Sequence, residues 1–146
     1  MNRLFYFSVP GRAEASRVAL ELSSLDWEDV EVNGETFNLM KNDGDLPWGM
    51  LPILQTSNGT IAESSAILRY AGKFAGLVPE DEYEAAKADE FMDGMGPLAR
   101  VLDTTFGISD LDERISLRKA LFEEGGKGSD NLQLLENKIG ESKTGW

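Results

Sequence analysis

The hydrophobic pattern of the 146-residue chain changes once, near Val78-Pro79, and this change limits the folds open to it. Before that point, short strand-like runs alternate with segments of helical spacing, which is typical of an α/β unit. After it, apolar residues recur only at helical spacing. The pattern therefore predicts an α/β domain over residues 1–77 and an all-helical domain over residues 79–146.

The first part of the chain begins with an apolar run that favours a strand buried on both faces. An amphipathic helix is predicted next, and Asn58-Gly59 between two later apolar runs is a strong hairpin signal. Residues 33–46 have weak periodicity and are predicted to be irregular, with at most one helical turn. The residues thus predict the order β-α-β, a loop, then β-β-α. The expected strands are 3–7, 27–32, 53–56 and 60–62, and the expected helices are 15–22 and 64–76.

The second part of the chain is predicted to be helical throughout. An apolar stripe from Ala85 to Leu102 predicts one long helix that begins near Glu80. Pro97 lies within it and should kink it, because proline removes a helical hydrogen bond and clashes with the preceding turn. Two further helices are expected over residues 110–124 and 131–139.

The chain contains no cysteine and no histidine, and its formal net charge is −12. Disulfides, thiol redox chemistry, Ser-His-Asp triads and zinc sites with Cys or His ligands are therefore excluded. The negative charge disfavours nucleic acid and anionic lipid. No apolar run approaches the roughly 18 residues of a membrane span, and residues 1–10 are too short for a signal peptide. We expect no metal, no nucleic-acid partner and no membrane partner.

Tyr6 ends the first predicted strand, just before the segment that leads into the first helix. A phenol at that place can donate its O–H to an anion bound beside the helix N-terminus. The alternative is a tyrosine of the hydrophobic core, which is the commoner case for a strand with two apolar faces.

Two further segments have the chemistry of a site for a peptide-like ligand. Leu51-Pro52 begins a strand, and a cis bond there would leave the backbone N–H and C=O of Leu51 free to pair with a ligand. The alternative is an ordinary trans proline at a strand edge. Glu63-Ser64 opens a helix, where N–H groups and a hydroxyl can hold a carboxylate while Glu63 takes an ammonium group. The alternative is a helix N-cap without a ligand.

The segment between residues 33 and 50 contributes weaker candidates. Lys41 and Phe37 can cover a pocket as a cation and an apolar wall, although a solvated lysine is commoner. Trp48 is predicted to be a packing anchor for the loop rather than a ligand contact.

Five short stretches, taken in order, resemble a known family: Phe5-Tyr6-Phe7, Gly11-Arg12-Ala13-Glu14, Leu51-Pro52-Ile53-Leu54, Glu63-Ser64 and Ala66-Ile67-Leu68-Arg69-Tyr70. They are similar to the cytosolic glutathione transferases of the tyrosine type, and to the sigma class in particular. The resemblance implies a thioredoxin-like glutathione-binding domain of order β-α-β-α-β-β-α, followed by an all-α domain that is incomplete relative to the family. It also implies a cytoplasmic homodimer that acts in detoxification.

The resemblance assigns roles to the candidate residues. It implies that the Tyr6 hydroxyl stabilises the glutathione thiolate, and that Lys41 contacts the glycyl carboxylate. The backbone of Leu51 would hold the cysteinyl part, and Glu63 and Ser64 the γ-glutamyl end. Glutathione would then be the co-substrate and a hydrophobic electrophile the second substrate.

Several residues depart from the family's pattern. Met50 stands where the family usually has Gln, before the presumed cis Pro52, and Phe37 stands where it usually has Trp. Pro97 occupies the position of an Asp that contacts the glutathione of the neighbouring subunit, so that contact is expected to be absent. Arg12 matches an arginine for which we expect a structural role.

The family's members run further at the C-terminal end, so the resemblance predicts a shortened helical domain. Such a domain should have exposed apolar surface, a partner that covers it, or marginal stability. Two alternatives to conjugation therefore stay open. One is a non-catalytic glutathione- or ligand-binding or structural protein on the same scaffold, and the other is a glutathione-dependent isomerase that uses the same site.

Overall fold

A computed structural model of the chain describes residues 1–141. The chain divides into two compact units, one from Met1 to Ala88 and one that begins at Asp89. Helix α4 (Glu82–Gly94) crosses this division. The domain boundary predicted at residues 77–79 stays a prediction.

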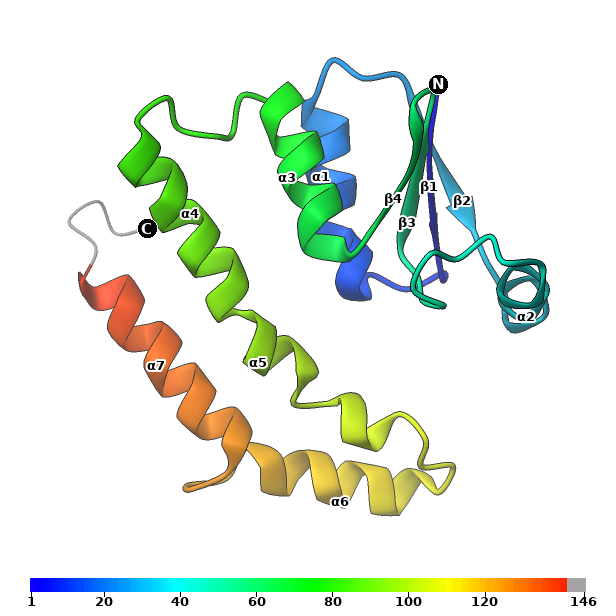
Figure 1. Cartoon of the computed structure of the whole chain (residues 1–146). Helices are drawn as coiled ribbons and strands as arrows, with labels where there is room; N and C mark the ends of the chain where they lie inside the picture. Colours follow the sequence, from blue (N-terminus) through cyan, green and yellow to red (C-terminus); the bar gives the residue numbers. More distant parts are fainter. Residues whose placement is uncertain (142–146) are drawn as a thin grey trace. The chain divides into compact units, whose positions relative to one another are not determined.

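A four-stranded mixed sheet forms the centre of the first unit (Figure 1). Its strands are β1 (Asn2–Tyr6), β2 (Trp27–Glu31), β3 (Ile53–Thr56) and β4 (Gly59–Ala62). They lie in the order β2-β1-β3-β4, with β1 parallel to β2 and antiparallel to β3. The predicted strands and the β3–β4 hairpin are confirmed, each to within a residue or so at its ends.

Helices cover both faces of this sheet (Figure 1). A short 3-10 turn, η1 (Gly11–Ala13), leads into α1 (Glu14–Leu22), which packs against α3 (Ser64–Phe74) on one face. Helix α2 (Gly34–Asp43) lies on the opposite side of the sheet. The order β-α-β-α-β-β-α, which the family resemblance implies, is confirmed.

The prediction that residues 33–46 are irregular was wrong, because most of this segment forms α2. The Asn33 side chain accepts a hydrogen bond of 2.9 Å from the backbone N–H of Thr36, which caps the helix. Gly44 ends it at φ +81°, a conformation that glycine adopts at little cost. Met40 is its one buried residue, so the helix has almost no apolar stripe for sequence periodicity to detect.

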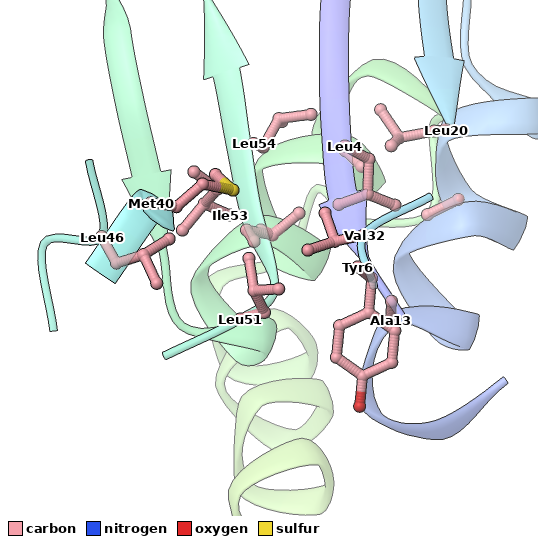
Figure 2. Packing of buried hydrophobic residues seen from close by; sticks show 13 residues of the cluster. Leu4, Tyr6, Ala13, Leu20, Val32, Met40, Leu46, Leu51, Ile53 and Leu54 are labelled. Carbon is pink, nitrogen blue, oxygen red and sulfur yellow. The ribbon is translucent and has the colours of Figure 1, made fainter. Parts of the chain in front are cut away.

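The core of the first unit lies between the sheet and its helices (Figure 2). Its largest fully buried apolar side chains come from β1, α1, β3 and α3: Leu4, Leu20, Ile53, Leu54 and Ile67. Burying each of them contributes about 2 kcal/mol relative to exposure, before entropy is counted. Tyr6 lies at the edge of this cluster, and Figure 2 shows its hydroxyl oxygen pointing away from the other apolar side chains.

The described part of the second unit is helical, as predicted. Its elements after α4 are α5 (Gly96–Arg100), the 3-10 turn η2 (Asp103–Thr105), α6 (Leu111–Phe122) and α7 (Lys127–Glu141). Helix α7 packs against α5 and α6. The prediction of one continuous helix from Glu80 was wrong, because α4 ends at Gly94 and α5 begins at Gly96; the interruption lies beside Pro97, where a kink was predicted. Pro97 lies in the first turn of α5, where its missing N–H has no helical partner to lose.

Residues 142–146 of the predicted helical domain lie outside the described residues. Within the described part, several large apolar side chains of α6 and α7 are exposed: Leu111, Ile115, Leu117, Phe122, Leu132, Leu134 and Ile139. In residues 1–141, no helix combines the length and the apolar character needed to cross a membrane.

Candidate functional site

Tyr6 ends β1 and is 8% exposed, so it packs at the edge of the core. Its hydroxyl oxygen accepts a hydrogen bond of 3.1 Å from the backbone N–H of Arg12. Gly11 permits this contact, because a Cβ built there would lie 2.7 Å from the Tyr6 Oη. A phenol has one proton to donate, and no acceptor for it is found among the described residues. That proton is therefore available to a bound anion.

Aromatic rings connect Tyr6 to α2. The ring centroids of Tyr6 and Phe7 lie 5.6 Å apart, edge to face, and those of Phe7 and Phe37 lie 5.5 Å apart. The Lys41 ammonium lies 6.0 Å from the centroid of the Phe37 ring. The predicted pair of Phe37 and Lys41 thus lies together, and it reaches Tyr6 through Phe7.

A small hollow of about 60 Å³ gathers most of the other predicted residues. Its lining includes five predicted residues: Met50, Leu51, Pro52, Glu63 and Ser64. The bond between Leu51 and Pro52 is cis, as the resemblance implies. Ala62, Trp48 and Arg12 complete the lining, whereas the other predicted residues, Tyr6, Phe37 and Lys41, are outside it.

The hollow borders the N-terminus of α3, which begins at Ser64. Glu63 precedes the helix at φ +72°, which non-glycine residues rarely adopt, and its side chain makes no capping hydrogen bond. The first N–H groups of the helix therefore keep their capacity to bind an anion. Strained residues of this kind cluster at ligand sites, because the surrounding structure must hold them in place.

The sequence analysis expected no ligand contact from two residues that line this hollow. Trp48 is 72% exposed and lines it, so the prediction that Trp48 is a packing anchor was wrong. Arg12 also lines it, while its backbone N–H binds the Tyr6 hydroxyl. The signal that could have found Arg12 is its place after Gly11, at the start of the turn that faces the end of β1.

Arg17 of α1 is a residue that the sequence did not single out. Its guanidinium carbon lies 5.7 Å from the centroid of the Tyr6 ring. Burial lowers the pKa of Arg17, but hydrogen bonds to Asp29 and Glu14 outweigh that effect and raise the pKa above its ordinary value. Arg17 is therefore a permanent cation beside the Tyr6 ring.

The sheet order, the helices on both faces, and the cis proline beside a helix N-terminus together define a thioredoxin-like domain. Residues 2–73 match the family model described as the N-terminal domain of glutathione S-transferase. The chain belongs to the cytosolic glutathione S-transferase family, which is a family of transferases.

Individual relatives are similar over most of the chain. Probable glutathione S-transferase 6 of Caenorhabditis elegans is 28% identical over 148 residues, which cover 99% of this chain and 69% of the relative. Glutathione S-transferase 3 of the same organism is 34% identical over 91 residues, which cover 62% of this chain and 43% of the relative. The solved structure of prostaglandin synthase D of Nilaparvata lugens superposes with a TM-score of 0.77 at 27% identity and covers 95% of this chain and 66% of that one.

These matches confirm the predicted fold class and family. The chain spans about two thirds of the length of the first of these relatives and less than half of the second. No group of three or more acidic side chains that could hold a metal ion occurs within residues 1–141.

Proposed function

We propose that this protein is a glutathione transferase that binds glutathione in its N-terminal domain and activates the thiol for attack on a hydrophobic electrophile. One observation carries the proposal. Arg12 lines the hollow formed by the cis-proline segment and the start of α3, and its backbone N–H holds the Tyr6 hydroxyl. A ligand that fills the hollow and extends past Arg12 therefore reaches the phenol.

The γ-glutamyl end of glutathione fits the hollow by charge. Its carboxylate pairs with the Ser64 hydroxyl and the first N–H groups of α3, which carry the positive end of the helix dipole. Its ammonium group pairs with the Glu63 carboxylate. The hollow, of about 60 Å³, has room for such a polar end group and leaves the rest of the tripeptide outside.

The remaining contacts follow the direction of the tripeptide. The backbone of Leu51, before cis Pro52, pairs with the cysteinyl part, and Met50 lies beside it. Lys41 takes the glycyl carboxylate, and Phe37 beneath its ammonium provides an apolar wall. Lys41 is thus the cation for the second carboxylate of the ligand.

Tyr6 supplies the chemistry of the site. A free thiol has a pKa near 8.5, so only a few per cent is thiolate at neutral pH. The phenolic proton, which the Arg12 N–H leaves free, donates to the sulfur and favours its charged form. A charge-assisted hydrogen bond of this kind lowers the pKa of the bound thiol by about one to two pH units.

The resemblance also supports a cytoplasmic homodimer with a detoxifying role. A second candidate, glutathione-dependent isomerisation, is favoured by the similarity to a structure named prostaglandin synthase D. Both reactions use the same thiolate, so they differ in the second substrate rather than in the residues of the glutathione site.

Calorimetry with glutathione tests the proposal, with two neighbouring serines as a matched pair. Ser64 lines the hollow, whereas Ser65 does not. The wild-type protein and Ser65→Ala should bind glutathione equally, and Ser64→Ala should bind it about tenfold more weakly, because a hydrogen bond to a charged group is lost. Absence of binding to the wild-type protein would overturn the proposal. Binding without turnover of a chlorodinitrobenzene would instead favour a non-catalytic glutathione-binding protein.

A further inference from the structure

The Arg17 side chain is less exposed and makes more hydrogen bonds than an arginine on a solvated helix face needs. Its side chain is 18% exposed, although arginine is usually a surface residue. Its Nε donates to Asp29 Oδ2 of β2 at 2.8 Å, and its Nη1 donates to Glu14 Oε2 at 3.3 Å. These two carboxylates fix the guanidinium against the Tyr6 ring, 5.7 Å from the ring centroid.

The same guanidinium binds the backbone that follows Tyr6. Its Nη1 donates to the carbonyl of Val9 at 2.9 Å and to that of Pro10 at 3.3 Å, and its Nη2 donates to the carbonyl of Phe7 at 3.3 Å. We call residues 7–10 the tyrosine loop. It leads directly into Gly11 and Arg12, so the position of the Arg12 N–H depends on it.

We propose that Arg17 is a positioning residue for Tyr6. Arg17 clamps the tyrosine loop between α1 and β2, and this keeps the Arg12 N–H aligned with the Tyr6 hydroxyl that it binds. This role rests on the proposed function, since it matters only where the phenol acts on a thiol. Arg17 itself does not line the hollow that receives glutathione. It acts through Tyr6 and is not a catalytic residue.

The geometry requires an arginine rather than a positive charge alone. The planar guanidinium has five N–H donors in a fixed fork, which here span two carboxylates and three carbonyls. A lysine has one nitrogen with three donors and cannot span this set. Arg17→Lys therefore keeps the charge near Tyr6 and removes the clamp.

Arg3 offers a matched control on the same strand as Tyr6. It also pairs with a carboxylate of β2, Glu28, at 2.9 Å, and it also lies over an aromatic ring, with 5.0 Å from its Cζ to the Phe5 centroid. Its side chain is 43% exposed, and among the described residues it binds no backbone carbonyl. Arg3→Lys thus makes the same exchange of guanidinium for ammonium beside a carboxylate and an aromatic ring, without touching the tyrosine loop.

The charges around Tyr6 stay the same in both lysine variants. Arg12 of η1 binds the Tyr6 hydroxyl, Arg17 of α1 lies over its ring, and Glu31 of β2 is its partner in the β1–β2 register. Glu14 of α1 and Asp29 of β2 bind Arg17 itself. A change in the thiol pKa of bound glutathione therefore reports geometry and not net charge.

The experiment compares wild type, Arg17→Lys and Arg3→Lys by three measurements. These are the dissociation constant of glutathione by calorimetry, the thiolate absorbance of bound glutathione across pH, and hydrogen exchange of the Arg12 amide. Arg17→Lys should have a glutathione dissociation constant within about twofold of the wild-type value. Its thiolate fraction at slightly acidic pH should be about tenfold lower than that of wild type. It should also speed exchange of the Arg12 amide about tenfold. Arg3→Lys should match wild type in all three.

The possible outcomes separate the inference from the proposed function. If the wild-type protein binds no glutathione, the proposed function fails. The clamp is then tested by hydrogen exchange of the Arg12 amide alone, which should still be faster in Arg17→Lys than in wild type. If glutathione binds, and Arg17→Lys has the wild-type thiol pKa and Arg12 exchange, the positioning role is overturned. Should Arg17→Lys fail to fold, Asp29→Asn weakens the same clamp while Arg17 remains, and it should shift both readouts in the same direction by a smaller amount.

Discussion

Tyr6→Phe is the substitution that separates glutathione binding from thiol activation. It removes one oxygen from a side chain at the edge of the core and keeps the ring that packs against Phe7. It also leaves the Arg12 N–H without its acceptor, which lowers the free energy of unfolding by about 1 kcal/mol. Glutathione affinity should change little, because the hollow does not include Tyr6.

The size of the catalytic effect follows from the hydrogen bond that is lost. A hydrogen bond to a charged group contributes about 1.5–3 kcal/mol, which corresponds to a rise of about one to two pH units in the thiol pKa. The thiolate fraction below that pKa falls about tenfold to a hundredfold. A thiolate of higher pKa is intrinsically more nucleophilic and recovers about half of this loss on a logarithmic scale. We expect the conjugation rate at slightly acidic pH to fall roughly threefold to tenfold.

The assay is the pH dependence of conjugation of a chlorodinitrobenzene at saturating glutathione. The Tyr6→Phe profile should be displaced to higher pH and should reach or exceed the wild-type rate above the pKa of the free thiol, because its fully ionised thiolate is the more nucleophilic one. Tyr83→Phe is the control, because Tyr83 is an exposed residue of α4. Coincident profiles for Tyr6→Phe and wild type would refute the role assigned to the phenol.

Three further predictions concern the backbone around the site. Glu63→Gly should raise the free energy of unfolding by about 1 kcal/mol, because glycine tolerates φ +72°. It should also weaken glutathione binding roughly tenfold, because the carboxylate that pairs with the ammonium group is lost. A variant less stable than wild type would contradict the first expectation. Gly11→Ala should lower the free energy of unfolding by about 2 kcal/mol, because its Cβ would collide with the Tyr6 hydroxyl. Gly34→Ala, where the Cβ would enter open space, should raise it by about 0.5 kcal/mol. Equal effects of the two substitutions in thermal unfolding would argue against the contact. Asn33→Ala should destabilise the protein by about 1 kcal/mol in chemical denaturation through loss of the α2 cap, and an unchanged midpoint would show that the cap is dispensable.

The sequence predicts the sheet well and the helices unevenly, for a physical reason. Strands such as residues 53–56 and the Asn58-Gly59 turn have local signals that the tertiary structure does not override. Helix α2 buries one residue and is defined by its two ends, so a search for apolar periodicity does not detect it. The disturbance between α4 and α5 was predicted as a kink at Pro97, but it is a break, because Pro97 is compatible with the first turn of a new helix.

The candidate site could be predicted where it depends on local chemistry. Glu63-Ser64 and Leu51-Pro52 are adjacent pairs whose backbone geometry follows from their own residues, and the structure gathers both at one hollow. Arg17 was not singled out, and the hollow was not expected to include Arg12 and Trp48, because the places of these residues depend on how distant segments meet. Arg17 has the sequence pattern of a solvated helix face, yet strand β2 and the tyrosine loop enclose it.

The proposed chemistry depends on contact between the phenol at the end of β1 and the sulfur of bound glutathione. The most direct measurement is a crystal structure of the protein grown or soaked with glutathione. The γ-glutamyl end should lie in the hollow beside Ser64, and the sulfur should lie within hydrogen-bonding distance of the Tyr6 hydroxyl. Glutathione bound with its sulfur out of reach of that hydroxyl, or bound elsewhere on the chain, would contradict the proposed chemistry.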